Sequence, residues 1–92
     1  MEHEWDPNKA ASNVKKHGIT FKGAATVFGD WLSVTYPNPD HSEGESRYVT
    51  IGLSAQNNVL VVSHTERRER TRIISARKAT RPEKKFYEEN KI

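Results

Sequence analysis

The stretch "HTERRERTRIISARK", residues 64–78, decides the fold because it joins two alternating runs through a highly charged turn. "VLVVSHTE" leads into the "ERRER" turn and "TRIISARK" leads out of it, so the pattern predicts two consecutive strands. His64 and Glu66 are two residues apart and therefore share a strand face, as do Arg70 and Arg72. If the strands pair as a hairpin, we expect these four side chains to converge.

The residues that precede this stretch show the start and stop signals of two helices. In "EWDPNKAASNVKKHG", Asp6 is a suitable N-cap, Pro7 suits the first helical position and Gly18 suits the residue past the end. In "ITFKGAATVFGD", Thr20 caps the second helix and Gly29 stops it. Two N-terminal helices are therefore predicted.

Strand patterns follow, and a last helix closes the chain. Residues 31–36 and 47–54 alternate like strands, and the turn-rich segment 36–46 connects them. At the C-terminus, Thr80 and Glu83 form a T-x-x-E capping box before the final helix. The order predicts an α+β fold, with an antiparallel sheet packed against the N-terminal helices and a C-terminal helix.

The length of 92 residues fits a single domain, 1–92, with one modest core. We expect a single core between helices and sheet, formed by Trp5, Val14, Phe21, Phe28, Val49, Ile51, Leu53 and either Ile73 or Ile74. The sequence contains no apolar run of about 18 residues and no leader with an apolar core, so we expect a cytoplasmic protein without a membrane span.

Charge is concentrated in one segment. Residues 67–85 hold nine basic and two acidic residues, a charge of +7, whereas the rest of the chain, with six basic and ten acidic residues, carries −4. Such a basic block indicates binding to phosphate backbones or to an acidic protein partner; the alternative is a solvated strand edge protected by charge. The candidate RNA-binding residues are Arg67, Arg68, Arg70, Lys78 and Arg81.

The residue types also limit the chemistry. The absence of cysteine excludes thiol nucleophiles and Cys-ligated zinc, and the four histidines lack the spacing of metal ligands, so we expect no metal and no cofactor. RNA cleavage without metal needs a base, an acid and cations that stabilise the phosphorane. His64, Glu66 and the arginines could supply these groups, although His64 could equally pack the sheet and Glu66 could simply pair with an arginine. Arg72 and Arg77 are five apart, so they share a face only if the strand ends or bulges between them.

Three segments carry a family resemblance over essentially the whole chain: "EWDPNKAASNVKKHGITFKGAATVF", "RYVTIGLS" and "RIISARKATRPEKKFYEE". They resemble the BrnT family of type II toxins. The resemblance implies a RelE-like fold and a ribonuclease that arrests translation without metal. It places catalysis on Arg72, Arg77 and Lys78 of the last strand, with His64 and Glu66 from the strand before.

The resemblance also implies partners. A BrnA-like antitoxin would neutralise the toxin, and the two together would repress their shared operon by binding operator DNA. Two other functions remain open at this point. One is a toxin of the same fold that acts on DNA gyrase, and the other is a nucleic-acid-binding module that does not cleave.

Overall fold

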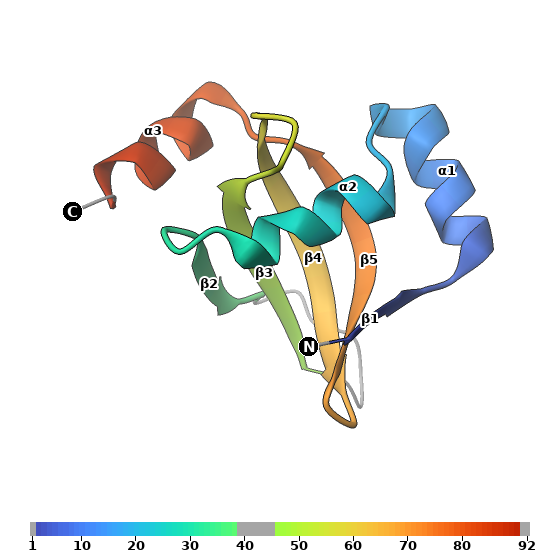
Figure 1. Ribbon diagram of the computed structural model, residues 1–92. Helices are drawn as coiled ribbons and strands as arrows, with labels where there is room; N and C mark the ends of the chain where they lie inside the picture. The colour runs from blue at the N-terminus through green and yellow to red at the C-terminus, as the bar shows by residue number, and fades with distance from the viewer. Residues whose placement is uncertain (1, 39–45, 91–92) are drawn as a thin grey trace.

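The computed structural model describes residues 2–38 and 46–90, which form a five-stranded sheet with helices on both faces (Figure 1). In chain order the elements are β1 (Glu2–Trp5), α1 (Pro7–His17), α2 (Phe21–Ala25), the 3₁₀ helix η1 (Thr26–Gly29), β2 (Val34–Pro37), β3 (Arg47–Leu53), β4 (Val59–Arg67), β5 (Arg70–Lys78) and α3 (Arg81–Glu89). The strand order is β1-β5-β4-β3-β2, and every neighbouring pair is antiparallel except β1 with β5. The predicted α+β arrangement is confirmed, with one parallel strand added at the edge.

That edge strand, β1, is the element that the sequence interpretation lacks. It pairs with β5 from Glu2 opposite Arg70 to Trp5 opposite Ile73. Four residues are too few to show a clear alternation of apolar and polar side chains. The strand is held by its partner, because backbone pairing and arginine–carboxylate contacts of Glu2 and Glu4 outweigh the low strand propensity of glutamate.

The helix ends follow the predicted capping residues. Asp6 accepts a hydrogen bond from the Asn8 amide at 2.7 Å, and Gly18 ends α1 in the left-handed conformation at φ 71°. Thr20 caps α2 in the same way, and η1 then extends it to Gly29. The capping box at the start of α3 is confirmed as well.

The β4–β5 hairpin turns through two residues. Arg67 pairs with Arg70, and between them Arg68 and Glu69 both have positive φ, 44° and 69°. Two consecutive positive values define a type I′ turn, whose twist matches that of the flanking strands. The hairpin predicted from the sequence is therefore present, with the shortest common loop.

A bulge interrupts β5 in the middle of this hairpin. Ser63 lies opposite Ser75 and the next residue, His64, lies opposite Ile73, so Ile74 has no partner residue on β4. An extra residue on one strand reverses the face on which the following side chains lie. Residues of β5 beyond Ile74 are therefore shifted by one position relative to those before it.

The sheet separates two apolar clusters, so the prediction of a single core is wrong. One cluster lies between the sheet and α1, α2 and η1, and its buried members are Ile19, Phe21, Ala24, Val27, Leu60, Val62, Ile73 and Ala76. The second lies between the sheet and α3, and its buried members are Val49, Ile51, Val61 and Tyr87. Because side chains alternate along β3, the predicted core residues of that strand point away from the N-terminal helices. We call the two sides the α1–α2 face and the α3 face.

The face of α1 that meets the sheet also differs from the prediction. Val14 is 45% exposed, whereas its neighbour Asn13 is buried. The Asn13 amide nitrogen donates to the carbonyl oxygens of Ile19 (2.9 Å) and Ala76 (2.8 Å), and its oxygen accepts from the Ala76 amide at 3.1 Å. A buried asparagine with its hydrogen bonds satisfied thus ties α1 to β5, in a place where an apolar residue was expected.

The carboxylate of Asp30 links α3 to the rest of the molecule. It accepts hydrogen bonds from the Leu53 amide at 2.8 Å and from the Tyr87 hydroxyl at 2.6 Å. Burial, and next the hydrogen bond to Asp30, raise the pKa of Tyr87 to about 12. This contact fixes the C-terminal half of α3 over the sheet.

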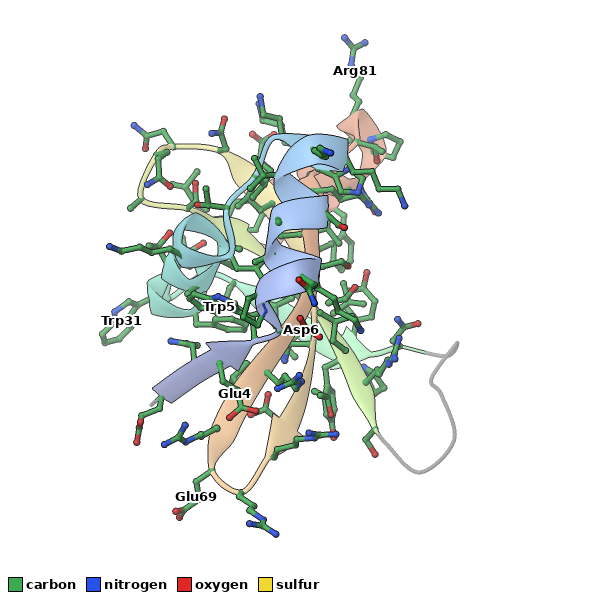
Figure 2. The ribbon with its side chains drawn as sticks, turned by 90° about the vertical axis from the view of Figure 1, so that its right-hand side faces the viewer. Glu4, Trp5, Asp6, Trp31, Glu69 and Arg81 are labelled. Atoms are coloured by element: carbon green, nitrogen blue, oxygen red, sulfur yellow. The ribbon has the colours of Figure 1, made fainter. Side chains whose placement is uncertain are left out.

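The predicted strand 31–36 begins later than expected. β2 starts at Val34, and Trp31, which is 98% exposed, projects from the loop that precedes it (Figure 2). Most of the predicted turn-rich connection 36–46 lies outside the described residues.

Candidate nucleic-acid interface

The two faces of the sheet divide the candidate catalytic residues. His64 lies opposite Ile73 of the core beneath α1 and α2, so it lies on the α1–α2 face, and Glu66 shares that face. Arg72 lies opposite Thr65 and therefore points to the α3 face. The expected convergence of His64 and Glu66 with the arginines is thus wrong.

The bulge nevertheless places the two candidate catalytic arginines on the same face of the sheet. Arg72 lies opposite Thr65 and Arg77 lies opposite Val61, and these two residues of β4 are four apart. Because β4 alternates regularly, Thr65 and Val61 share a face, and so do the arginines. Without the extra residue Ile74, Arg72 and Arg77 would lie on opposite sides of the sheet. The sequence analysis required a bulge or a strand end between Arg72 and Arg77 for them to share a face, and the structure has the bulge.

Arg72 belongs to a row of charged side chains across the α3 face. Its Nη1 lies 3.0 Å from Glu4 Oε2, and Arg70 contacts Glu2 at 3.3 Å and Glu4 at 3.7 Å. Figure 2 shows Glu4 directed toward the hairpin end of the sheet. A cleft of about 540 Å³ opens here, lined by Glu4, Arg67, Arg68 and Arg70. The hairpin end thus offers several guanidinium groups to an anionic ligand.

Arg47 joins this row, and the sequence interpretation did not include it. It lies opposite Thr65 from the β3 side, so Arg47 and Arg72 flank Thr65 on the same face. Its Nε is buried, and no acceptor among the residues described in the structure reaches it. A buried donor without such a partner is uncommon in proteins. Arg47 is the first residue of the predicted strand 47–54, and the sequence pattern there does not indicate that it lies beside Arg72.

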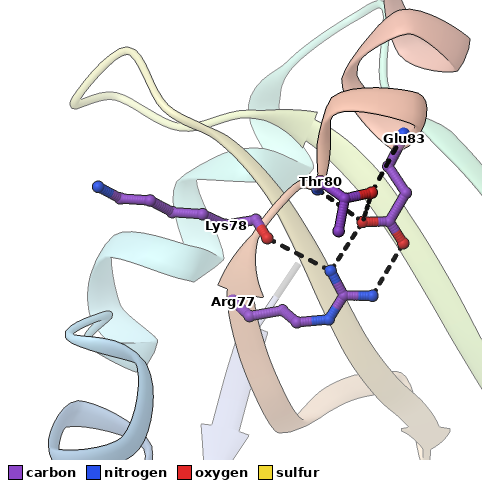
Figure 3. A network of polar contacts seen from close by, with 4 residues as sticks. All are labelled: Arg77, Lys78, Thr80 and Glu83. Atoms are coloured by element: carbon purple, nitrogen blue, oxygen red, sulfur yellow. Dashed lines mark hydrogen bonds and ion pairs between the residues drawn. The ribbon is translucent and has the colours of Figure 1, made fainter.

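Arg77 is bound to the first turn of α3 (Figure 3). Its Nη1 and Nη2 donate to the two carboxylate oxygens of Glu83 at 2.7 and 2.8 Å, a bidentate pair. One of these oxygens also accepts from the Thr80 amide at 2.8 Å. The hydrogen bonds from Arg77 are the largest cause that holds the pKa of Glu83 at about 2, and in turn Glu83 raises the pKa of Arg77.

On the α1–α2 face, His64 is enclosed by hydrogen bonds and aromatic rings. It is 4% exposed; its Nδ1 lies 3.0 Å from Glu66 Oε2 and its Nε2 lies 2.8 Å from Thr50 Oγ1. Since the ionised carboxylate only accepts, Nδ1 carries the proton and Nε2 accepts from the Thr50 hydroxyl. Phe28 packs edge-on against the imidazole at 4.9 Å between ring centroids.

Burial lowers the pKa of His64, against the opposing effect of the hydrogen bond to Glu66, so the imidazole is neutral near pH 7. A cleft of about 250 Å³ lies beside it, lined by Phe28, Thr35, Tyr48, His64, Glu66 and Thr71. The structure therefore holds a second polar site, which is separated from the arginines by the sheet.

The other candidate RNA-binding residues do not form one continuous surface. Arg68 lies in the hairpin turn, whereas Arg81 lies at the opposite end of the molecule from the neighbouring turn residue Glu69 (Figure 2). Lys78 lies opposite Leu60 and so points to the α1–α2 side. The +7 segment is therefore divided between two ends and two faces. The part of this segment that lies on the α3 face consists of Arg67, Arg70, Arg72 and Arg77.

Residues 2–38 and 46–90 contain neither a metal-binding cluster nor a membrane-spanning helix. No cluster of three or more His, Asp or Glu side chains there is arranged to hold a metal ion. None of the helices in these ranges is both long enough and apolar enough to cross a membrane.

Comparison with known proteins agrees with this architecture. Residues 5–83 match the family described as "Ribonuclease toxin, BrnT, of type II toxin-antitoxin system". The structure is similar to the 1.1 Å crystal structure of the Brucella abortus ribonuclease toxin BrnT, with a TM-score of 0.65 and 27% sequence identity over 88% of this chain and 99% of that one. No curated protein sequence matches the chain. The match over most of its length shows that the chain belongs to the BrnT family of ribonuclease toxins of type II toxin–antitoxin systems.

Proposed function

We propose that this chain is an endoribonuclease that cleaves RNA without a metal ion, arrests translation, and binds the reacting phosphate on its α3 face. The observation that carries the proposal is the bulge at Ile74, which places Arg72 and Arg77 on one face of the sheet. Family membership supports the ribonuclease activity. The arginine arrangement supports the location and the independence from metal, because guanidinium groups supply the positive charge that a metal would otherwise provide.

The proposed reaction is an attack of the RNA 2′-hydroxyl on the adjacent phosphorus. The 2′-hydroxyl gives its proton to solvent water and its oxygen bonds to phosphorus, the bond from phosphorus to the 5′-oxygen breaks, and that oxygen takes up a proton from water. The products are a 2′,3′-cyclic phosphate and a 5′-hydroxyl. Arg72 and Arg77 would donate to the phosphate oxygens as their negative charge increases in the phosphorane.

The carboxylates that now bind these arginines fit this role. Glu4 holds Arg72 and Glu83 holds Arg77, so each guanidinium is oriented before RNA arrives. Arg47, which flanks Thr65 on the same face as Arg72, is proposed as a third phosphate ligand. Phosphate contacts from Arg67, Arg68 and Arg70 at the hairpin end would extend the binding surface along the RNA backbone.

His64 and Glu66 are proposed to support the sheet rather than to contact the same phosphate. Their hydrogen bonds connect β4 to Thr50 of β3, and Thr50 lies 2.7 Å from Thr35 of β2, oxygen to oxygen. The polar cleft beside His64 is the rival position for the reaction. If His64→Gln abolished cleavage in a folded protein while Arg72→Ala retained it, the reacting phosphate would belong on the α1–α2 face.

A BrnA-like antitoxin is the proposed inhibitor, and the two proteins together are proposed to bind operator DNA. Membership of a type II toxin–antitoxin family supports an antitoxin partner. The basic hairpin end suits a partner with acidic residues interleaved among apolar ones. With RNA as its proposed substrate, the toxin is proposed to act in the cytoplasm.

The test is incubation of the purified chain with single-stranded RNA in excess EDTA. We expect cleavage to persist, to be lost in Arg72→Ala, and to be unchanged in the matched control Lys15→Ala, which removes an exposed charge from α1. Binding without cleavage would favour the non-catalytic module. Growth arrest without RNA cleavage, together with inhibition of gyrase supercoiling, would favour the gyrase-directed alternative.

A further inference from the structure

A groove on the α3 face lies between the edge strand β2 and helix α3. It encloses about 420 Å³ and is lined by Val34, Tyr36, Ile51, Pro82, Glu83 and Phe86. Its floor is buried, with Ile51 at 2% exposure, whereas Tyr36 and Phe86 are 37% and 42% exposed. Two aromatic side chains thus remain open to solvent beside an apolar floor.

The groove ends at the proposed phosphate-binding arginine. Glu83, which lines it, holds the Arg77 guanidinium through both carboxylate oxygens. Tyr36 lines the same groove as Glu83, the residue that holds this guanidinium. The space between β2 and α3 therefore combines two aromatic rings and an apolar floor with a cation and a hydrogen-bond acceptor.

We infer that this groove binds one unpaired base of the RNA substrate, which stacks on Tyr36 and Phe86 while its phosphate contacts Arg77. This rests on the proposed ribonuclease function and names its substrate class: single-stranded RNA, because a base in a duplex has both faces covered. Exposed aromatic side chains beside arginine are the usual means of binding unpaired bases.

The charges at the groove favour a nucleotide over an apolar peptide. An apolar side chain would fill the floor but make no polar contact with the Arg77–Glu83 ion pair at the end of the groove. A nucleotide satisfies both parts, since its phosphate can pair with Arg77 and the N–H groups of its base can donate to Glu83. A second copy of this chain or an apolar antitoxin segment is the competing occupant.

The experiment measures the affinity of the full chain for a fluorescent single-stranded RNA made uncleavable by 2′-O-methyl groups. Tyr36→Ala and Phe86→Ala should each weaken binding about 5- to 150-fold, the usual range when an aromatic side chain that stacks on a base is replaced by alanine. Phe86→Leu should be nearly as weak, because leucine keeps the apolar contact but has no ring. Trp31→Ala is the matched control, since Trp31 is exposed but lies outside the lining of the groove.

An RNA that lacks a single base tests the stacking itself. The wild-type chain should bind the abasic strand more weakly than the intact strand, and Phe86→Ala should bind both equally. Duplex RNA of the same sequence should be bound weakly by all variants.

The outcome separates this inference from the proposed function. If Tyr36→Ala and Phe86→Ala bind the single strand as tightly as the wild type while Arg72→Ala loses cleavage, the groove inference fails and the ribonuclease proposal stands. If the groove variants lose antitoxin binding or self-association but keep RNA affinity, the groove is a protein interface and the inference is overturned. A wild-type chain that binds and cleaves no RNA would refute the proposed function itself.

Discussion

The ion pair between Arg77 and Glu83 should make the stability of the protein depend on pH in the acidic range. The pKa of Glu83 is lowered from 4.5 to about 2 in the folded chain. At 1.36 kcal/mol per pH unit, that lowering corresponds to roughly 3 kcal/mol. Because 26% of the Glu83 side chain and 41% of the Arg77 side chain are exposed, solvent screens the pair, and we expect about 1–2 kcal/mol.

The direction follows from the lowered pKa. A carboxylate that is more acidic in the folded state stabilises the protein above its unfolded pKa near 4.5, and this contribution is lost as pH falls toward 2. Glu83→Gln removes the charge but keeps an oxygen that can accept from the Thr80 amide. The variant should therefore be less stable by about 1–2 kcal/mol at pH 7, and the difference should vanish near pH 2.

Urea unfolding at a series of pH values measures this difference. Thr20→Ala is the matched control, since it removes the N-cap hydroxyl of α2, which accepts from the Gly23 amide, and leaves the Arg77–Glu83 ion pair in place. Its cost, about 1 kcal/mol for a lost cap, should be nearly the same at every pH. If the Glu83→Gln and wild-type curves remained parallel from pH 7 to pH 2, the ion pair would not be responsible for the low pKa.

Other predictions concern activity, packing and the partner. Arg72→Ala and Arg77→Ala should each abolish growth arrest, because one lost bidentate phosphate contact costs roughly 2–4 kcal/mol in the transition state, a rate loss on the order of 10²–10³; Arg77→Lys should also be impaired, and full toxicity in both alanine variants would exclude them from the site. Asn13→Ala should destabilise the chain by about 2–4 kcal/mol in urea unfolding, because it leaves buried backbone groups at Ile19 and Ala76 without partners; a loss under 1 kcal/mol would mean that water replaces the amide. Association with the antitoxin, followed by stopped flow, should slow markedly as salt increases while dissociation changes little, and an association rate indifferent to salt would place the docking surface away from the basic end.

Much of the fold follows from local signals in the sequence. The caps at Asp6, Thr20 and Thr80 and the helix end at Gly18 are short-range features, and each is confirmed. The alternation of Val49 and its neighbours along β3 likewise predicts which side chains share a face. These features depend on neighbours within four or five residues, so the sequence around each position is sufficient.

The separation of His64 and Glu66 from Arg72 depends on the length of the β4–β5 turn, and the charged "ERRER" segment does not indicate that length. A two-residue turn pairs Glu66 with Thr71 and places His64 opposite Ile73, so Arg72 points away from both acid and base. A three-residue turn over residues 68–70 would have placed Arg72 opposite Glu66, on the same face as His64 and Glu66. Adding one residue to the turn shifts the register of the hairpin by one, and this shift moves the side chains of β5 to the other face of the sheet.

Other features depend on tertiary partners that no local pattern reveals. Asn13 is buried because the Ala76 backbone beyond the bulge needs hydrogen bonds, and β1 forms because β5 offers an edge. Arg47 joins the site only through the β3–β4 register. The sequence did give the condition for Arg72 and Arg77 to share a face, namely a bulge between them, and the structure contains it.

The chemistry of the RNA ends formed in EDTA tests the central claim most directly. A defined single-stranded RNA is incubated with the purified chain in excess EDTA, alongside the same RNA with one 2′-deoxy nucleotide at the cleaved position, and the products are identified by mass spectrometry. Attack by the 2′-hydroxyl predicts a 2′,3′-cyclic phosphate and a 5′-hydroxyl, no cleavage at the deoxy position, and loss of product in Arg72→Ala. Cleavage that requires a divalent cation, or that leaves a 5′-phosphate and also occurs at the deoxy position, would contradict the proposal that arginines on the α3 face stabilise a metal-independent attack by the 2′-hydroxyl.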